Sequence, residues 1–245
     1  MEKGLQKNVP QNQVSVTAGS VTLAGNLDIP QGAKGIVLFA HGSGSSRFSP
    51  RNQFVAQMLQ KAGLATLLLD LLTPQEEAID RQTKRLRFDI DRLAARLIGA
   101  THWLQESLST RNLNIGYFGA STGSAAALVA ASFCQDAVSA IVSRGGRIDL
   151  AGEALSRVKA PTLLIVGGDD TPVLQLNQKA LVQLQMKKQL AVITGATHLF
   201  EEPGALEQVA QLASRWFNHY FTPVDPRSSS RQGTNPQRFV KHSPR

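Results

Sequence analysis

The sequence predicts an α/β fold with a mostly parallel, twisted sheet of about eight strands and helices on both of its faces. Short apolar runs bounded by glycine or aspartate, such as residues 36–40 and 64–69, are typical of strands buried on both sides. Longer segments with helical periodicity separate these runs, so right-handed crossovers should join consecutive strands. Near the N-terminus, two alternating segments flank Gly19-Ser20 and predict a hairpin, which would give the sheet an antiparallel edge.

The elements follow one another without an internal linker or repeat. The first helix should begin at Pro50 and end before Gly63, because proline favours the first turn and glycine the end of a helix. Between Leu71 and Arg87 there is no room for a large lid, so the pocket should be shallow or covered by one short helix. Strands are expected at 14–17, 21–28, 36–40, 64–69, 115–118, 138–142, 162–166 and 191–193, and helices at 50–62, 85–108, 121–133, 173–184 and 203–221.

The composition is typical of a globular protein. The chain has 245 residues, 42% of them hydrophobic and 18% charged, which is enough to bury one large core. Its one cysteine, Cys134, excludes an internal disulfide bond and is expected to be a core thiol. Residues 1–13 lack the apolar run of a signal peptide, and no run approaches the ~20 apolar residues that span a bilayer. We therefore expect a soluble, cytoplasmic protein that does not enter membranes.

The net charge of +8 is concentrated in the C-terminal tail. Residues 222–245 contain five basic residues and one acid, a net charge of +4, so the other 221 residues carry only the remaining +4. The tail is rich in Ser, Pro, Gln and Arg and is expected to be disordered, either as a simple solvated tail or as a weak tether to a polyanion. The predicted organisation is a flexible N-terminus (1–13), one α/β domain (14–221) and a disordered basic tail (222–245), with no specific nucleic-acid partner.

A candidate nucleophile follows the strand at 115–118. The segment Gly119-Ala120-Ser121-Thr122-Gly123 has the pattern Gly-x-Ser-x-Gly between a buried strand and a helix. A serine on such a sharp turn adopts strained backbone angles, and its neighbours two residues away must be small so that strand and helix can approach. The alternative is that Ser121 is an ordinary helix N-cap.

A base and an acid follow later strands, in the order Ser, Asp, His. Asp169 and Asp170 follow the strand at 162–166, and His198 follows the strand at 191–193. Ligands in such sheets bind at the carboxyl ends of the strands, so these side chains should meet Ser121 there. A serine hydroxyl needs a base that a carboxylate orients. Asp170 is favoured as that carboxylate, because Thr171 can cap the next helix, and Asp169 is the alternative.

The Gly/Ser-rich segment 41–47 follows the third strand, where an acyl-transfer enzyme needs an amide for the developing oxyanion. Ser43 is the candidate donor, together with the amide of Thr122, and His41 is expected to shape the loop. A competing interpretation is a dinucleotide-binding fingerprint, in which Gly42-x-Gly44 is followed by Asp70. It is disfavoured, because Arg47 occupies the third glycine position and Asp70 lies 28 residues after Gly42.

Four arginines follow strands at the same edge. Arg47, Arg51, Arg144 and Arg147 could together bind a carboxylate or phosphate of a substrate, or they could pair with local acids such as Asp149. No paired-histidine metal motif occurs in the sequence, so neither a metal nor a cofactor is predicted.

These motifs resemble the α/β-hydrolase superfamily, and more narrowly the dienelactone-hydrolase-like proteins, over about residues 14–221. The resemblance implies an α/β-hydrolase fold with a minimal lid, and it implies Ser121, Asp170 and His198 as nucleophile, acid and base. The superfamily's Gly-x-x-Asp-x-x-Val spacing matches Gly167, Asp170 and Val173. Dienelactone hydrolases themselves carry a cysteine nucleophile, so the serine is a departure that puts dienelactone itself in doubt as the substrate.

The sequence therefore predicts a serine hydrolase that acts on a small-molecule ester or lactone, with a carboxylate on the substrate as a further feature. Two alternatives are a non-catalytic binding protein with the same fold and, less favoured, a dinucleotide-binding enzyme.

Overall fold

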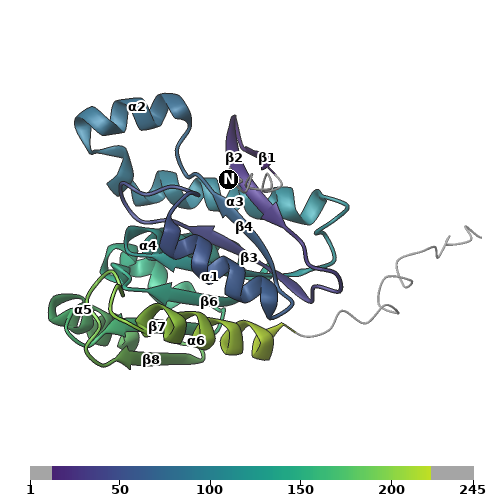
Figure 1. The fold of residues 1–245 in the computed structure, drawn as a ribbon. Helices are drawn as coiled ribbons and strands as arrows, with labels where there is room; N and C mark the ends of the chain where they lie inside the picture. Colours follow the sequence, from purple (N-terminus) through teal and green to yellow (C-terminus); the bar gives the residue numbers. More distant parts are fainter. Residues whose placement is uncertain (1–12, 222–245) are drawn as a thin grey trace, which may run out of the picture.

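The centre of the molecule is an eight-stranded sheet in the order β1-β2-β4-β3-β5-β6-β7-β8. The computed structural model describes residues 13–221 and shows the strands crossing the middle of the molecule between two layers of helices (Figure 1). The strands are β1 (Gln13–Ala18), β2 (Val21–Asp28), β3 (Gly35–Ala40), β4 (Ala65–Leu69), β5 (Asn114–Ala120), β6 (Val138–Arg144), β7 (Thr162–Gly167) and β8 (Lys188–Ile193).

The sheet has the predicted antiparallel edge. β1 and β2 form an antiparallel hairpin, β2 pairs antiparallel with β4, and every pair from β4 to β8 is parallel. The central strands β3, β4 and β7 are buried along their whole length, as their apolar runs indicate. The parallel strands therefore bring their carboxyl ends, and the loops that follow them, to one edge of the sheet.

Two helical layers cover the sheet. On one face, α1 (Pro50–Lys61) and α6 (Ala205–Tyr220) pack side by side. On the other face lie α3 (Ile90–Glu106), α4 (Thr122–Phe133) and α5 (Thr171–Gln183). Each layer encloses its own cluster of buried apolar side chains, so the sheet is a rigid platform between two cores.

The structure differs from the sequence expectation in the segments after β4 and β6. The helix predicted at 85–108 is divided, because Asp89 caps α3 and the residues before it form the short 3-10 helix η1 (Leu86–Phe88). The short helix allowed for between Leu71 and Arg87 is α2 (Pro74–Thr83), which begins with a capping box formed by Thr73 and Glu76. A further 3-10 segment, η2 (Ile148–Arg157), follows β6 and was not predicted.

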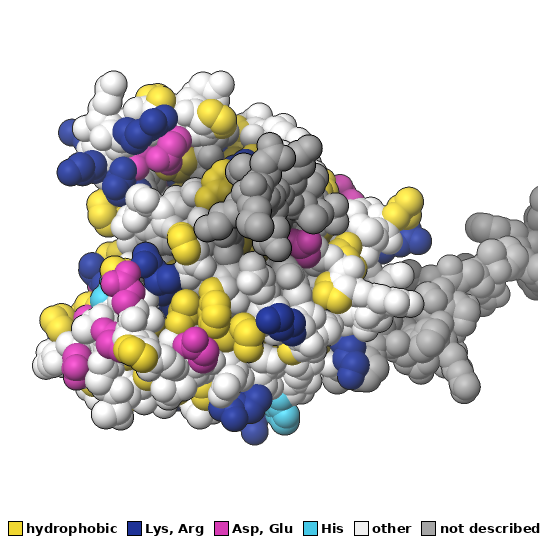
Figure 2. All heavy atoms as spheres, in the orientation of Figure 1, with side chains coloured by type: hydrophobic (Ala, Val, Ile, Leu, Met, Phe, Trp, Pro, Cys, Tyr) yellow, Lys and Arg dark blue, Asp and Glu magenta, His cyan; other side chains and the backbone are white. Residues whose placement is uncertain are grey.

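The predicted C-terminal tail and all but the last residue of the predicted flexible N-terminus lie outside the described residues. Within residues 13–221, no helix is both long enough and apolar enough to cross a membrane. On the face shown in Figure 2, basic and acidic side chains are interspersed across the domain.

Candidate active site

Ser121 lies on a strained turn between β5 and α4. Its backbone angles are φ 50° and ψ −121°, a region that non-glycine residues rarely adopt and that costs about 1–3 kcal/mol. It occupies the N-cap position of α4, but its side chain makes no capping hydrogen bond. The Ser121 amide donates to the Arg144 carbonyl (3.1 Å), and its carbonyl accepts from the Arg147 amide (3.0 Å). The turn is thus held by the end of β6, and the hydroxyl is left free.

The two glycines of the motif are sterically required. A Cβ on Gly123 would lie 2.2 Å from the Ala40 carbonyl oxygen, and a Cβ on Gly119 would lie 2.5 Å from the Cα of Ser124. Both distances are below those that real Cβ atoms show. These glycines therefore allow α4 to start directly against β3 and β5.

Asp170 and His198 are in contact. The Asp170 Oδ2 lies 2.7 Å from the His198 Nδ1, and the Asp170 side chain is mostly buried, whereas that of His198 is 38% exposed. Asp170 itself occupies the N-cap position of α5, and Thr171 is the first residue of the helix, so the expected cap at Thr171 is wrong. Because the Asp170 carboxylate makes no capping bond, it is available to the imidazole. The neighbouring Asp169 is exposed.

His198 also lies beside the strand end that holds Ser121. A Cβ on Gly145 would be 3.4 Å from the Nδ1 and Cε1 atoms of His198, so the ring packs against the backbone directly after Arg144. Among the described residues, the Ser121 Oγ has no hydrogen-bond partner. In hydrolases without substrate, the hydrogen bond between nucleophile and base is often long and tightens only in the complex.

The two amides proposed for an oxyanion are free. Neither the Ser43 amide nor the Thr122 amide donates a hydrogen bond to another described group. The loop that carries Ser43 reaches the nucleophile, because a Cβ on Gly42 would lie 3.1 Å from the Ser121 Cβ. The structure therefore brings Ser43, Thr122 and Ser121 to the same edge of the sheet as Asp170 and His198.

The model of the dienelactone hydrolase family matches residues 23–222. The chain belongs to this family. A crystal structure of a dienelactone hydrolase from Anabaena variabilis is 65% identical to this family member, with a TM-score of 0.84, and the match covers 85% of this chain and 96% of that one. The esterase Est1E from Butyrivibrio proteoclasticus is only 14% identical over 85% of this chain and 98% of its own, with a TM-score of 0.69, and so shows the fold alone.

Longer relatives are also known. Two Mycobacterium tuberculosis proteins, from strains CDC 1551 and H37Rv, bear the name "Putative phosphoribosyl transferase". Each is 58% identical to this chain over 205 residues, which is 84% of this chain but 45% of the relative. This dienelactone hydrolase family member thus spans less than half the length of these curated relatives, so their name describes a longer chain.

The loop that carries Ser43 is fixed by contacts behind it. The His41 Nε2 accepts a hydrogen bond from the Leu71 amide (3.1 Å), and its Nδ1–H donates to the Gly42 carbonyl (2.9 Å). Burial lowers the pKa of His41, which is therefore neutral and has both ring nitrogens engaged within the loop. The Arg47 amide and guanidinium both bind Asp70.

The contact between Arg47 and Asp70 argues against the dinucleotide fingerprint. The side chain of Arg47 occupies the carboxylate that would bind a ribose. The strand order also differs from the 3-2-1-4-5-6 order of the dinucleotide-binding fold.

A second support for the loop was not found from the sequence. The Asp80 side chain is 1% exposed and accepts hydrogen bonds from the Arg87 amide (3.0 Å) and from the Arg87 Nε–H (2.6 Å). The guanidinium continues to the loop, where a Cβ on Gly44 would lie 3.1 Å from the Arg87 Nη1. A hollow of only about 10 Å³ lies between the loop and these side chains. α2 therefore acts as a buttress for the loop.

The ion pair between Asp80 and Arg87 stabilises the folded state at neutral pH. Burial acts to raise the pKa of Asp80, but the hydrogen bonds and charge of Arg87 outweigh it and hold that pKa below its ordinary value. The ionised form of Asp80 is therefore stabilised in the folded state, and the ion pair makes its full contribution to stability at neutral pH. It is lost as the pH falls through the lowered pKa.

Removing the Arg87 side chain should affect stability and turnover. We expect Arg87→Ala to lower the free energy of unfolding by about 2–4 kcal/mol, because Asp80 stays buried without its partner. The kcat for an activated ester should fall roughly tenfold, since the Ser43 amide is no longer held in place. Thermal unfolding and steady-state kinetics measure the two effects.

Two controls separate an effect on the Ser43 loop from a general loss of stability. Arg96→Ala removes an ion pair with Glu76 (2.7 Å) between α2 and α3, and should lower stability while leaving kcat within about twofold. The double variant Asp80→Leu/Arg87→Leu should recover stability but not kcat. If Arg87→Ala retains the wild-type kcat, the proposed buttress is wrong.

The structure resolves the two alternatives for the four arginines. Three of them pair with an acid, as Arg47 does with Asp70, Arg51 with Glu201 (2.9 Å) and Arg147 with Asp149 (2.9 Å). Arg144 has no acidic partner among the described residues. The proposal of a shared anion site formed by all four guanidinium groups therefore reduces to Arg144.

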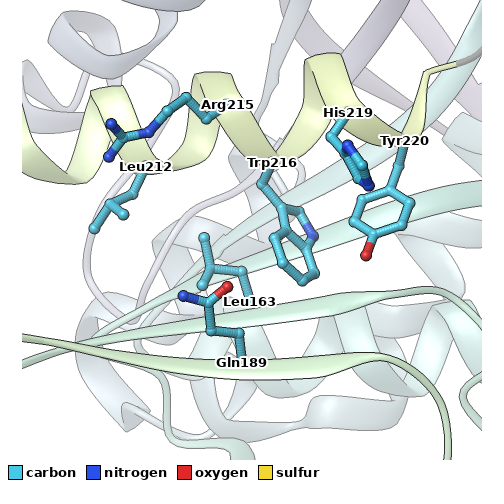
Figure 3. A pocket seen from close by; sticks show the side chains of 7 residues that line it. All are labelled: Leu163, Gln189, Leu212, Arg215, Trp216, His219 and Tyr220. Carbon is cyan, nitrogen blue, oxygen red and sulfur yellow. The ribbon is translucent and has the colours of Figure 1, made fainter.

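A large groove lies away from these residues. A hollow of about 540 Å³ is bounded by the C-terminal half of α6 and by the first residues of β7 and β8 (Figure 3). Trp216 and Tyr220 project from α6 toward Gln189 on the edge strand. Because this groove is at the start of the strands, it is at the opposite edge of the sheet from Ser121.

Proposed function

We propose that this protein is a serine hydrolase that cleaves a small ester or lactone through an acyl-enzyme intermediate. The observation that carries the proposal is the strained Ser121, whose hydroxyl is free, at the same sheet edge as the Asp170–His198 pair. Backbone strain at a single serine is retained where the surrounding structure enforces it, which is typical of a nucleophile. Membership of the dienelactone hydrolase family supports hydrolysis as the reaction class.

In the proposed mechanism, Asp170 accepts a hydrogen bond from the Nδ1–H of His198 and so leaves the Nε2 unprotonated. The Nε2 takes the proton of the Ser121 hydroxyl as the oxygen attacks the substrate carbonyl carbon. The charge that develops on the carbonyl oxygen is stabilised by the Ser43 and Thr122 amides. The imidazolium then protonates the leaving alcohol oxygen, and the bond between this oxygen and the carbonyl carbon breaks.

The second half of the reaction repeats these steps with water. The Nε2 removes a proton from a water molecule, and the resulting nucleophile attacks the acyl-enzyme carbonyl. When the tetrahedral intermediate collapses, the Ser121 oxygen leaves and recovers its proton from His198. A lactone would follow the same path, except that its alcohol and acid remain in one product molecule.

The short cover that follows β4 favours a small substrate. A hollow of about 270 Å³ lies between the Ser43 loop and the segment that joins β4 to α2, and residues such as Ser45, Ser46 and Leu72 line it. α2 is tied to the rest of the fold by the ion pairs of Glu76 with Arg92 and Arg96, so it does not behave as a free lid. None of Ser121, Asp170 and His198 lines this hollow, so we base the expectation of a small substrate on the single short helix that covers this side.

A covalent probe tests the proposal directly. A fluorophosphonate should react with the Ser121 Oγ, which forms an oxygen–phosphorus bond as fluoride leaves and the proton passes to His198. Intact mass should increase by one phosphonyl group, and peptide mapping should place the group on Ser121. A protein that stays unmodified would favour a non-catalytic binding protein with this fold instead.

A further inference from the structure

Arg144 is a buried cation without a counter-ion. It is the last residue of β6 and is 7% exposed. The Nε is buried and has no hydrogen-bond partner, and the Nη2 makes a single long hydrogen bond of 3.4 Å to the Asn52 Oδ1. No carboxylate of the described residues lies within ion-pair distance of this guanidinium. A buried charge is normally paired, because leaving water is unfavourable for it.

The surroundings of Arg144 compensate its buried charge only weakly. The positive charge of Arg51 adds repulsion, and the Arg51 guanidinium is paired with Glu201. On the other side, the Arg144 Cζ lies 5.8 Å from the centre of the Phe200 ring, a cation–π contact at the outer limit of the usual range, which replaces neither a counter-ion nor the missing hydrogen bonds. Burial and Arg51 lower the pKa of Arg144 to about 10, so the group remains charged at neutral pH.

The guanidinium lies among the segments that carry the proposed catalytic groups. The Arg144 carbonyl accepts the Ser121 amide hydrogen, and Arg144 is in register with Ala120, the residue before the nucleophile. Asn52, its one hydrogen-bond partner, belongs to the first turn of α1, which follows the Ser43 loop. Phe200 follows His198 by two residues. One molecule could therefore reach both Ser121 and Arg144.

We propose that Arg144 binds an oxyanion group of the substrate, a carboxylate or a phosphate, while the ester or lactone of the same molecule lies at Ser121. The bound oxyanion supplies the missing counter-charge and accepts hydrogen bonds from the guanidinium nitrogens that have no partner in the protein. This inference rests on the proposed hydrolase for the reaction, but not for the binding.

A matched series of esters tests the specificity. The mono-4-nitrophenyl esters of succinic, glutaric and adipic acid carry a free carboxylate. The neutral partners keep the 4-nitrophenyl ester and carry a methyl ester in place of the carboxylate. A 4-nitrophenyl phosphonoalkanoate carries a phosphonate. Spontaneous hydrolysis is subtracted with Ser121→Ala. We expect kcat/KM for the best anionic ester to exceed that of its neutral partner at least tenfold, and this ratio to fall at least tenfold in Arg144→Met, mainly through KM.

The control variant is Arg147→Met, which removes a guanidinium three residues away that is already paired with Asp149. Its ratio between anionic and neutral esters should stay within about twofold of the wild-type value. A wild-type ratio near one, or equal losses for both ester types in Arg144→Met, would overturn the inference. The relative rates of carboxylate and phosphonate esters identify which oxyanion is preferred.

Stability provides a readout that does not depend on activity. If Arg144 serves a ligand, Arg144→Met removes an uncompensated buried charge and should leave Tm unchanged or raise it by about 2–5 °C. At constant ionic strength, glutarate or inorganic phosphate should raise the Tm of the wild type but not that of Arg144→Met. A Tm that falls in Arg144→Met, with no ligand effect in the wild type, would assign Arg144 a structural role.

The two proposals fail in different ways. If the fluorophosphonate labels Ser121 but anionic and neutral esters react equally, the hydrolase remains and the oxyanion site is wrong. If no labelling occurs but glutarate or phosphate still stabilises only the wild type, the oxyanion site remains and the hydrolase is wrong.

Discussion

Ser121→Ala should lower kcat for an activated ester by about 10⁴- to 10⁶-fold and abolish labelling by a fluorophosphonate, because no other group can form the acyl-enzyme. KM should change little if the substrate is held by groups other than the hydroxyl. Ser124→Ala is the matched control, since this buried serine lies one turn away in α4 and has no role in the proposed chemistry. Activity in Ser121→Ala above one hundredth of the wild-type value would contradict the assignment.

The same position should show a conflict between stability and activity. At φ 50° and ψ −121°, glycine has no steric penalty, so Ser121→Gly should raise the free energy of unfolding by about 1 kcal/mol while abolishing turnover. Chemical denaturation measures the difference between Ser121→Gly and Ser121→Ala, which retains the strain. If Ser121→Gly is less stable than Ser121→Ala, the backbone at this turn is not strained in solution.

Asp170→Asn should lower kcat by about 10⁴-fold, the second largest effect that we expect. The amide can donate a hydrogen bond to the Nδ1 of His198, which would then place the proton on the Nε2 and prevent it from accepting the Ser121 proton. KM should stay within a few fold, because the proposed oxyanion donors are unchanged. Steady-state kinetics with a neutral 4-nitrophenyl ester measures both parameters.

Asp169→Asn is a close control for that experiment. Asp169 is adjacent in the chain and exposed, and it contacts the neighbouring segment through its amide, which donates to the Ala196 carbonyl (3.0 Å). We expect Asp169→Asn to retain kcat within about threefold. If the large loss occurs in Asp169→Asn and not in Asp170→Asn, the acid has been assigned to the wrong residue.

The sequence predicted the sheet, and it placed the candidate catalytic residues after the carboxyl ends of the strands, because both depend on local pattern. Buried strands such as β5 and β7 are continuous apolar runs. Ser121 directly follows β5, whereas Asp170 lies three residues after β7 and His198 five residues after β8. The start of α2 was not predicted, although Thr73, Pro74 and Glu76 carry its signal, a capping box with a proline in the first turn. The segment was too short and too polar for its periodicity to indicate the helix.

Other features could not be predicted, because they depend on which distant groups meet. Four arginines after strands have the same local signature, but only the tertiary structure shows that three of them pair with acids and that Arg144 does not. In the same way, the contact of Arg87 with Gly44 joins residues that are 43 positions apart in the sequence. Two helix starts were also misplaced, because Asp89 holds the N-cap position of α3 and Asp170 holds that of α5.

The attachment of α2 has a consequence for redesigning this enzyme scaffold. Replacing residues 74–88 by a longer segment, in order to enlarge the binding space, would also remove the Asp80–Arg87 ion pair that supports the Ser43 loop. Such chimaeras should accept bulkier molecules but process all of them slowly, whatever their size. Grafts that preserve this ion pair, and lengthen the chain only on the outer side of α2, should widen the range of accepted substrates without lowering the turnover of all of them.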